Sequence, residues 1–321
     1  MRNVLVSRRL RGSASALALA TAVLAAPQVA AAATCIWNGG TGTYTTSGDW
    51  SCGAIPGSAD DVQVLVAGSV VNLVGGSNHA GTLDLGAGNQ FNLNAGADFF
   101  VDNHAVTNNG VITIANASRF ISGSGTVTVD GTGAIVLDDT TNYAQITNGG
   151  FVFGSGQTVR GSGGLGVNNT LVTNNGLINA DVSGGNLFID VAGGNGSLGG
   201  GGVGTGGNSG LFNTGTMQAD NSTLTFQGGR YENSAAGVIK AINSGTVALA
   251  NDSRIIGGTL TSDGASTIAA TGGTRYLQNV TLSSGTRLNV TTGADLQVNG
   301  GIVNNGTITI ANAARMFNET G

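Results

Sequence analysis

The chain has 321 residues, of which 17 are acidic and 12 are basic, and its formal net charge is −5. Four of the basic residues lie within the first 11 positions, so the remainder carries eight basic residues, including a single lysine, Lys240. Proteins bind nucleic acids and anionic membrane surfaces through clustered Lys and Arg, and this chain has no such cluster. The composition therefore excludes both classes of partner.

The N-terminal 33 residues have the pattern of a secretory signal peptide. Basic residues from Arg2 to Arg11 precede an apolar stretch at 14–26, and four alanines at 30–33 follow. Small residues in that place are typical of a signal-peptidase site, so we expect cleavage after Ala33 or within one or two residues of it. Two other export signals remain open, a twin-arginine signal at Arg8 and lipidation of Cys35. No later segment reaches the roughly 20 apolar residues of a membrane helix.

The rest of the chain alternates apolar and polar residues over short segments. Hydrophobic residues make up 40% of the sequence, and 57 glycines punctuate it. Alternation with a period of two indicates β-strands that bury one face and expose the other, and Gly, Asn and Ser between them indicate turns. The clearest strands lie at 82–85, 91–93, 111–114, 126–129, 187–191 and 224–226.

These strands belong to a longer repeat. Residues 108–117 return almost unchanged at 304–313, and weaker copies lie at 174–180, 213–219 and 237–241. A unit of about 22 residues accounts for their spacing, as three, two, one and three turns, and units of this length are typical of solenoids. We therefore predict an all-β fold, a single right-handed parallel β-helix of about a dozen coils over 67–321. Unrelated hairpins with Asn-Gly turns are the alternative.

The repeated phrase also predicts which side chains are buried. Ile112 and Ile114 should point into the core. The asparagines that open each copy should occupy equivalent turns on successive coils and hydrogen-bond to one another as a ladder. They are Asn108, Asn174, Asn213 and Asn304. The Gly-rich stretch at 193–210 predicts a loop that projects from one coil.

Residues 34–66 share no repeat phrase and predict an N-terminal cap, which solenoids need in order to cover an open sheet edge. The segment holds both tryptophans, Trp37 and Trp50, and both cysteines. Because exported chains meet an oxidising compartment, a Cys35–Cys52 disulfide is expected. Two cysteines without neighbouring histidines do not predict a metal site.

The opening Trp-Asn-Gly, the second Trp, Pro-Gly and Asp-x-Val of the cap resemble the start of autotransporter-type β-helix passengers. The Asn-x-Gly-x-Ile-x-Ala phrase resembles the repeats of those passengers and of filamentous haemagglutinin-like adhesins. The resemblance covers 34–321 and implies surface display, adhesion and biofilm roles. It also implies a C-terminal outer-membrane barrel, which would be the only contact with the membrane. The sequence to Gly321 contains no such barrel, so the export route stays open.

The sequence offers little for catalysis. Asp138-Asp139 is the only adjacent carboxylate pair beyond the cap, where Asp60-Asp61 lies, and no Gly-x-Ser-x-Gly motif occurs. The two histidines, His79 and His104, have no partners at metal-ligand spacing.

We therefore predict no catalytic, cofactor-binding or metal-binding residues and no cofactor. The expected function is that of an exported adhesin-like protein of the cell surface, outer membrane or extracellular space. Its expected partners are glycans or proteins of host or neighbouring cells and other copies of itself. The alternative is a polysaccharide lyase or hydrolase, which would bring two or three carboxylates together in one lateral groove.

Overall fold

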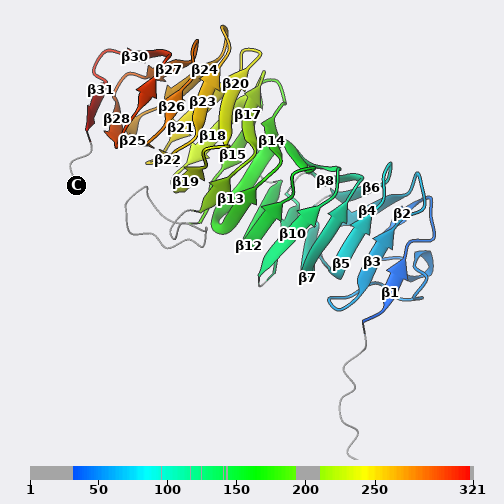
Figure 1. Ribbon diagram of the computed structural model, residues 1–321. Helices are drawn as coiled ribbons and strands as arrows, with labels where there is room; N and C mark the ends of the chain where they lie inside the picture. Colours follow the sequence, from blue (N-terminus) through cyan, green and yellow to red (C-terminus); the bar gives the residue numbers. More distant parts are fainter. Residues whose placement is uncertain are drawn as a thin grey trace, which may run out of the picture. The chain divides into compact units, whose positions relative to one another are not determined.

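The computed structural model describes residues 32–318, apart from 95, 116, 124, 140, 142–143 and 193–209. These residues form a β-solenoid of about 11 turns in which strands stack in parallel from β1 to β31 (Figure 1). The described residues contain no α-helix, and therefore no helix that is long and apolar enough to cross a membrane. One 3₁₀ turn, η1, covers Ser47–Asp49. The signal-peptide prediction falls almost entirely on residues outside the described part.

Each coil contributes strands to three parallel sheets, which we number in chain order. Sheet 1 contains β1 (Thr34–Ile36), β3 (Asp61–Val64), β10 (Thr126–Asp130), β16 (Leu211–Asn213), β19 (Arg230–Asn233), β22 (Arg254–Ile256), β25 (Gly273–Gln278), β28 (Ala294–Asn299) and β31 (Arg315–Asn318). Sheet 2 contains β2 (Thr41–Thr43), β4 (Val70–Val74), β6 (Gln90–Asn94), β8 (Val111–Ala115), β11 (Ala134–Asp138), β14 (Leu177–Ala180), β17 (Thr216–Asp220), β20 (Val238–Ile242), β23 (Thr259–Ser262), β26 (Thr281–Leu282) and β29 (Val303–Asn304).

Sheet 3 contains β9 (Arg119–Ile121), β15 (Asn186–Ile189), β18 (Thr223–Gln227), β21 (Thr246–Ala250), β24 (Thr267–Ala270), β27 (Arg287–Val290) and β30 (Thr307–Ile310). Four long strands turn a corner without a break. Of these, β5 (Ser77–Leu85), β7 (Asp98–Asn108) and β12 (Gln145–Phe153) run from sheet 3 into sheet 1, and β13 (Thr158–Asn174) runs through all three sheets.

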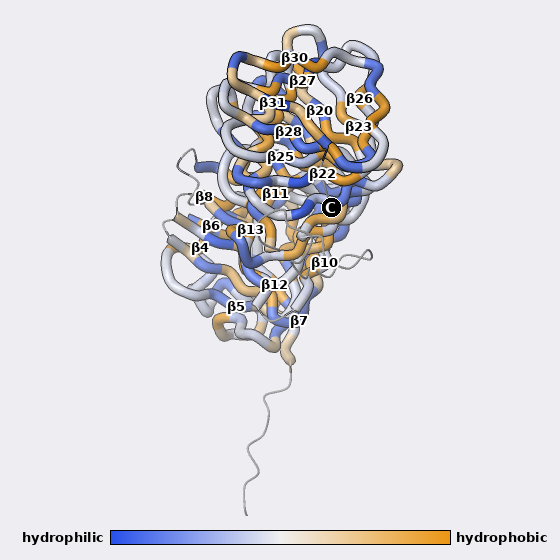
Figure 2. The backbone as a smooth tube through the Cα atoms, turned by 90° about the vertical axis from the view of Figure 1, so that its left-hand side faces the viewer, coloured by the Kyte–Doolittle hydropathy of each residue, from blue (hydrophilic) through white to orange (hydrophobic). Residues whose placement is uncertain are grey.

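The two-residue period of the strands fixes which side chains fill the interior. In β8, Ile112 and Ile114 are fully buried, as predicted, and Thr113 between them faces outward. Parallel register places each inward side chain against its equivalent on the next coil, about 4.8 Å away, so Ile112 lies between Phe91 and Ile135. Figure 2 shows the alternation as orange and blue segments along the coils. The core is therefore continuous along the stack, and its end at β30 leaves Ile310 47% exposed.

The N-terminal segment 34–66 already contains coil strands, because β1 pairs with β3 and β2 pairs with β4. Cys35 and Cys52 form a disulfide with Cα atoms 5.0 Å apart. Trp37 and Trp50 are almost fully buried and meet edge to face, with ring centroids 4.9 Å apart. The disulfide thus pins the first strand to the segment that carries Trp50.

The cap tryptophans continue into a row of aromatic side chains in the core. The Trp50 indole nitrogen donates a hydrogen bond to the Tyr44 carbonyl oxygen at 2.8 Å, and the two rings lie 5.2 Å apart. Tyr44 in turn contacts Phe91 and Phe99 edge to face, each at 6.0 Å. Edge-to-face pairs add about 0.5–1.5 kcal/mol each beyond the area they bury. The cap and the first coils therefore share one core.

A buried asparagine ladder runs along the corner between sheets 1 and 2. Asn174 and Asn213 stand in register, and the Asn174 side-chain amide donates to Asn213 Oδ1 at 2.8 Å. The ladder continues to Asn233, which lies outside the recognised phrase and whose Oδ1 accepts from Asn213 at 2.7 Å. The step from Asn174 to Asn213 is one coil rather than the two expected, because the strands that end in these residues, β13 and β16, pair directly. The loop predicted at 193–210 lies, apart from Gly210, outside the described residues.

Asn108 occupies the same corner, but its partner is not an asparagine. Its amide donates to Gln157 Oε1 at 3.1 Å, and Gln157 Nε2 donates back to the Asn108 carbonyl oxygen at 2.8 Å. Gly131 lies between them, and a Cβ there would come within 2.3 Å of the Asn108 carbonyl oxygen. The missing side chain lets the two amides meet across a coil.

The assignment of Asn304 to this ladder is wrong. Asn304 ends β29 in sheet 2, in register with Leu282, and it is exposed. The matching phrases 108–117 and 304–313 consequently form strands in different sheets, β8 in sheet 2 and β30 in sheet 3. In both phrases the Asn Oδ1 accepts a hydrogen bond from the glycine nitrogen two residues later. The phrase encodes a corner turn followed by a strand, and every corner of the coil can use it.

Candidate functional site

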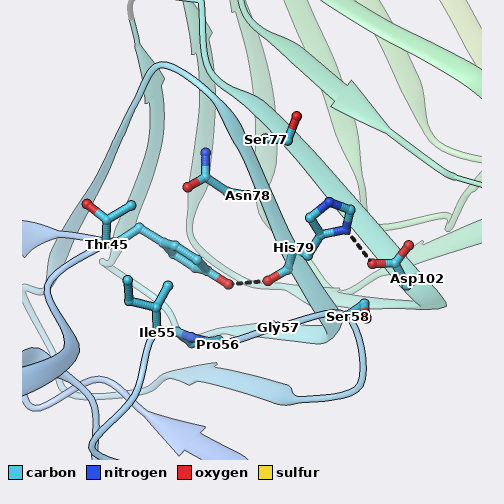
Figure 3. Close-up of a pocket in the computed structure, with 10 residues that line it drawn as sticks. Thr45, Ile55, Pro56, Gly57, Ser58, Ser77, Asn78, His79 and Asp102 are labelled. Atoms are coloured by element: carbon cyan, nitrogen blue, oxygen red, sulfur yellow. Dashed lines mark hydrogen bonds and ion pairs between the residues drawn. The ribbon is translucent and has the colours of Figure 1, made fainter.

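A pocket of about 580 Å³ opens between the cap and the first long strands. One wall is the chain before and after η1, and the other wall comes from the start of β5 and from β7 (Figure 3). Its lining residues are Tyr44, Thr45, Ile55, Pro56, Gly57, Ser58, Ser77, Asn78, His79 and Asp102.

The pocket contains a histidine that is oriented by a carboxylate. His79 Nδ1 lies 2.8 Å from Asp102 Oδ2, and the imidazole stacks on Phe100 with centroids 4.6 Å apart. Parallel pairing of β5 with β7 puts His79 beside Phe100, so Asp102, two residues further on, reaches the same outer face. Behind them the Tyr44 hydroxyl donates to the His79 carbonyl oxygen at 2.6 Å. The Tyr44 pKa is raised far above its ordinary value, first by burial and then by the charge of Asp60.

A carboxylate that orients an imidazole is part of many hydrolytic sites, but a nucleophile is also needed. In the described part of the chain no hydroxyl hydrogen-bonds to the His79 ring, and Figure 3 shows the Ser77 hydroxyl directed away from it. The arrangement can donate and accept hydrogen bonds with a ligand in the pocket. It lacks the nucleophile–base contact of a covalent hydrolase.

The other sequence candidates do not line this pocket. Asp139 Oδ1 accepts from the Thr141 backbone nitrogen at 2.7 Å, as in an Asx turn, and neighbouring Asp138 is exposed at the end of β11. Asp60 accepts from the backbone nitrogens of Gly57 and Ala33, so its role is to hold the cap. Within the described residues, no three His, Cys, Asp or Glu side chains are grouped to hold a metal ion.

His104 stands on a strained piece of backbone. Its φ is +64°, and its Nε2 is buried without a hydrogen-bond partner among the described residues. A Cβ on Gly125 would lie 2.4 Å from that nitrogen, so the glycine is what makes room for the ring. His104 packs against the next coil and does not reach His79.

A shallow hollow of about 310 Å³ lies on the outer face of sheet 1. Asp61 and Asp84, from adjacent coils, both border it, and the Thr82 hydroxyl donates to Asp61 Oδ1 at 2.8 Å. The further lining residues are Gln63, Leu83, Ala105 and Thr107. Two carboxylates at one lateral hollow are the minimum that the alternative, a polysaccharide lyase or hydrolase, requires, so that alternative would rest on Asp61 and Asp84.

No protein-family model matches the chain, and no curated protein matches it.

Sequence reasoning missed the contact between His79 and Asp102. The signal was available, because the two residues are 23 apart and the repeat is about one coil of that length. Residues one coil apart on the outer face meet side by side, as Asp98 and Arg119 also do with a spacing of 21. A sequence period therefore predicts outer-face pairs as well as core contacts.

Proposed function

We propose that the chain is exported and acts at the cell surface or outside the cell as an adhesin-like protein, without catalysis. The observation that carries the proposal is the regular outer surface of the stack. On sheet 1, Asp61, Thr82, Ala105 and Thr128 lie in one row, each in register with the next. Such rows present short, mostly polar side chains at the spacing of strands, which suits contact with extended glycans, with proteins or with another copy of the chain.

Two further features support an extracellular setting. The Cys35–Cys52 disulfide closes the cap, and disulfides persist in oxidising compartments. The chain at 49–51 pairs antiparallel with the end of β1, through the Ser51 nitrogen to the Ile36 carbonyl oxygen, and so covers part of a sheet edge that would otherwise recruit other chains. A closed end and a polar outer surface let the protein stay soluble while it offers a long lateral face.

The proposal is tested by coating fluorescent beads with residues 33–321 and measuring their attachment to bacterial and animal cells and to one another. We expect attachment above that of albumin-coated beads, and reduced attachment after Thr82→Arg and Thr107→Arg place two bulky cations on sheet 1. The matched control is Thr113→Arg, which places the same side chain on sheet 2. Attachment no greater than that of albumin on every surface would remove the adhesin role.

A further inference from the structure

Another hollow, of about 230 Å³, lies on the outer face of sheet 3, at the coil that contains the middle of β13. Two consecutive outward positions on this coil are glycines, Gly164 and Gly166, which pair with Gln145 and Thr147 on the coil before. At these two positions the coil contributes no side chain to the outer face of sheet 3. At Gly166 the next coil approaches closely, since a Cβ there would lie 2.4 Å from the Asp190 carbonyl oxygen, and the hollow forms beside Gly164. The lining residues are Gln145, Gly164, Val167, Phe188, Asp190 and Gln227.

The groups around the gap combine one apolar face with several polar side chains. Phe188 is in register with Gly164, so its half-buried ring stands beside the glycine. The Asp190 carboxylate accepts hydrogen bonds, and the amides of Gln145 and Gln227 both donate and accept them. Pockets for small ligands combine an apolar wall with a few convergent polar groups in this way.

The rim of the hollow is strained. Val167 has φ +49° and Asn168 has φ +60°, and a β-branched residue at positive φ is an outlier. The Asn168 nitrogen donates to the Asp190 carbonyl oxygen at 2.7 Å, which ties this turn to the strand that carries the carboxylate. Strained backbone of this kind is found most often at functional sites. Val167, 37% exposed, is held at the edge of the gap as a result.

The strands behind the hollow are fixed from inside. The fully buried Tyr231 hydroxyl lies 2.7 Å from the carbonyl oxygens of Ile189 and Gln227. Ile189 directly precedes Asp190, and Gln227 itself lines the hollow. Burial raises the pKa of the Asp190 carboxyl above its ordinary value. The carboxyl is thus partly withdrawn from water in a preformed site.

We propose that this hollow binds one neutral hexose unit of a glycan, with a face of the sugar ring on Phe188 and its hydroxyls bonded to Asp190 and the two glutamines. The inference deepens the proposed adhesive function, on which it rests, by naming the ligand class of one site. Hydroxyl groups both donate and accept, so they match a carboxylate and two amides together. The volume lies below the 300–1,000 Å³ usual for larger ligands, which limits the site to one sugar unit.

Two other ligand classes fit less well. An acidic sugar would place a second negative charge beside the Asp190 carboxylate, whose pKa burial already raises. A quaternary ammonium group is held best by several aromatic faces, and among the described residues that line the hollow Phe188 alone is aromatic.

The test is saturation-transfer NMR on residues 33–321 with the methyl glycosides of glucose, galactose, mannose and N-acetylglucosamine at millimolar concentration. We expect saturation of at least one glycoside by the wild-type chain, and a tenfold or greater loss of affinity in Phe188→Ala and in Asp190→Asn. Phe212→Ala, which removes a half-buried outward ring on sheet 1, should bind as the wild type does. Circular dichroism of each variant checks that the fold is kept.

The inference is overturned if no glycoside is saturated by the wild-type chain, if Phe188→Ala binds as well as Phe212→Ala, or if methyl glucuronide or tetramethylammonium binds in place of the neutral glycosides. The bead assay separates this failure from that of the adhesive function. Beads that attach equally with wild-type and Phe188→Ala chains place adhesion elsewhere on the surface, whereas beads that never attach remove adhesion itself.

Discussion

Asn213→Ala should destabilise the solenoid strongly at one coil. The Asn213 side chain accepts from Asn174 at 2.8 Å and donates to Asn233 Oδ1 at 2.7 Å and to the Gly215 carbonyl oxygen at 3.1 Å. Each of these bonds contributes about 1 kcal/mol net, and leaving the buried Asn233 oxygen without its donor adds about 1 kcal/mol or more. We therefore expect a loss of about 4 kcal/mol in the local free energy of unfolding.

The matched control is Asn304→Ala, which changes the same residue in the same sequence phrase. Asn304 is exposed, and among the described residues its Oδ1 accepts one hydrogen bond, from the Gly306 nitrogen at 3.1 Å, so the expected loss is about 0.5 kcal/mol or less. Solenoid coils open locally, so amide hydrogen exchange read by mass spectrometry is the assay, with peptides around 213 and 304 compared. Equal losses at the two positions would refute the assignment of Asn213 to a buried ladder.

Three further predictions concern the cap and the core. Cys35→Ser removes the disulfide, which joins residues 17 apart in sequence, and should lower the free energy of unfolding of the cap by about 3 kcal/mol. Thermal melts measure this loss, and adding reductant should lower the melting temperature of the wild type but not that of the variant. Ile114→Asp buries an unpaired charge and should unfold the neighbouring coils in circular dichroism, while Thr113→Asp on the outer face should not. Gly215→Ala sets a Cβ 2.1 Å from a backbone oxygen and should lower the melting temperature, whereas Gly264→Ala, with open space around it, should leave it nearly unchanged.

Most of the fold could be predicted from the period-two pattern of apolar residues. It predicted the strands and the inward direction of Ile112 and Ile114, because burial of alternate apolar residues needs no knowledge of the turns. The repeat length then predicted stacked coils. It could not tell one corner from another, since Asn-x-Gly makes the same local turn at each, and so Asn304 was misplaced.

The candidate sites could not be predicted from the sequence, because they depend on which side chains neighbouring coils leave exposed. The hollow on sheet 3 forms where an outward position is a glycine, Gly164, and one glycine in a repeat rich in glycine gives no distinct signal. The positive φ of Val167 is likewise invisible in a sequence, because it is imposed by the turn and by the hydrogen bond from Asn168 to Asp190. These sites are tertiary features of adjacent coils.

The central claim is that the chain works outside the cytoplasm, and the mass of the intact protein recovered from outside the producing cells tests it most directly. The Ala33 nitrogen donates to Asp60 Oδ1 at 2.9 Å, and the Ala33 carbonyl oxygen accepts from the Asp61 nitrogen, so a mature chain that keeps Ala33 preserves both bonds. We predict a chain that begins at Ala33 and has the mass of the Cys35–Cys52 disulfide, with no alkylation before reduction. A protein found only inside cells, beginning at Met1 and alkylated at both cysteines, would contradict the account.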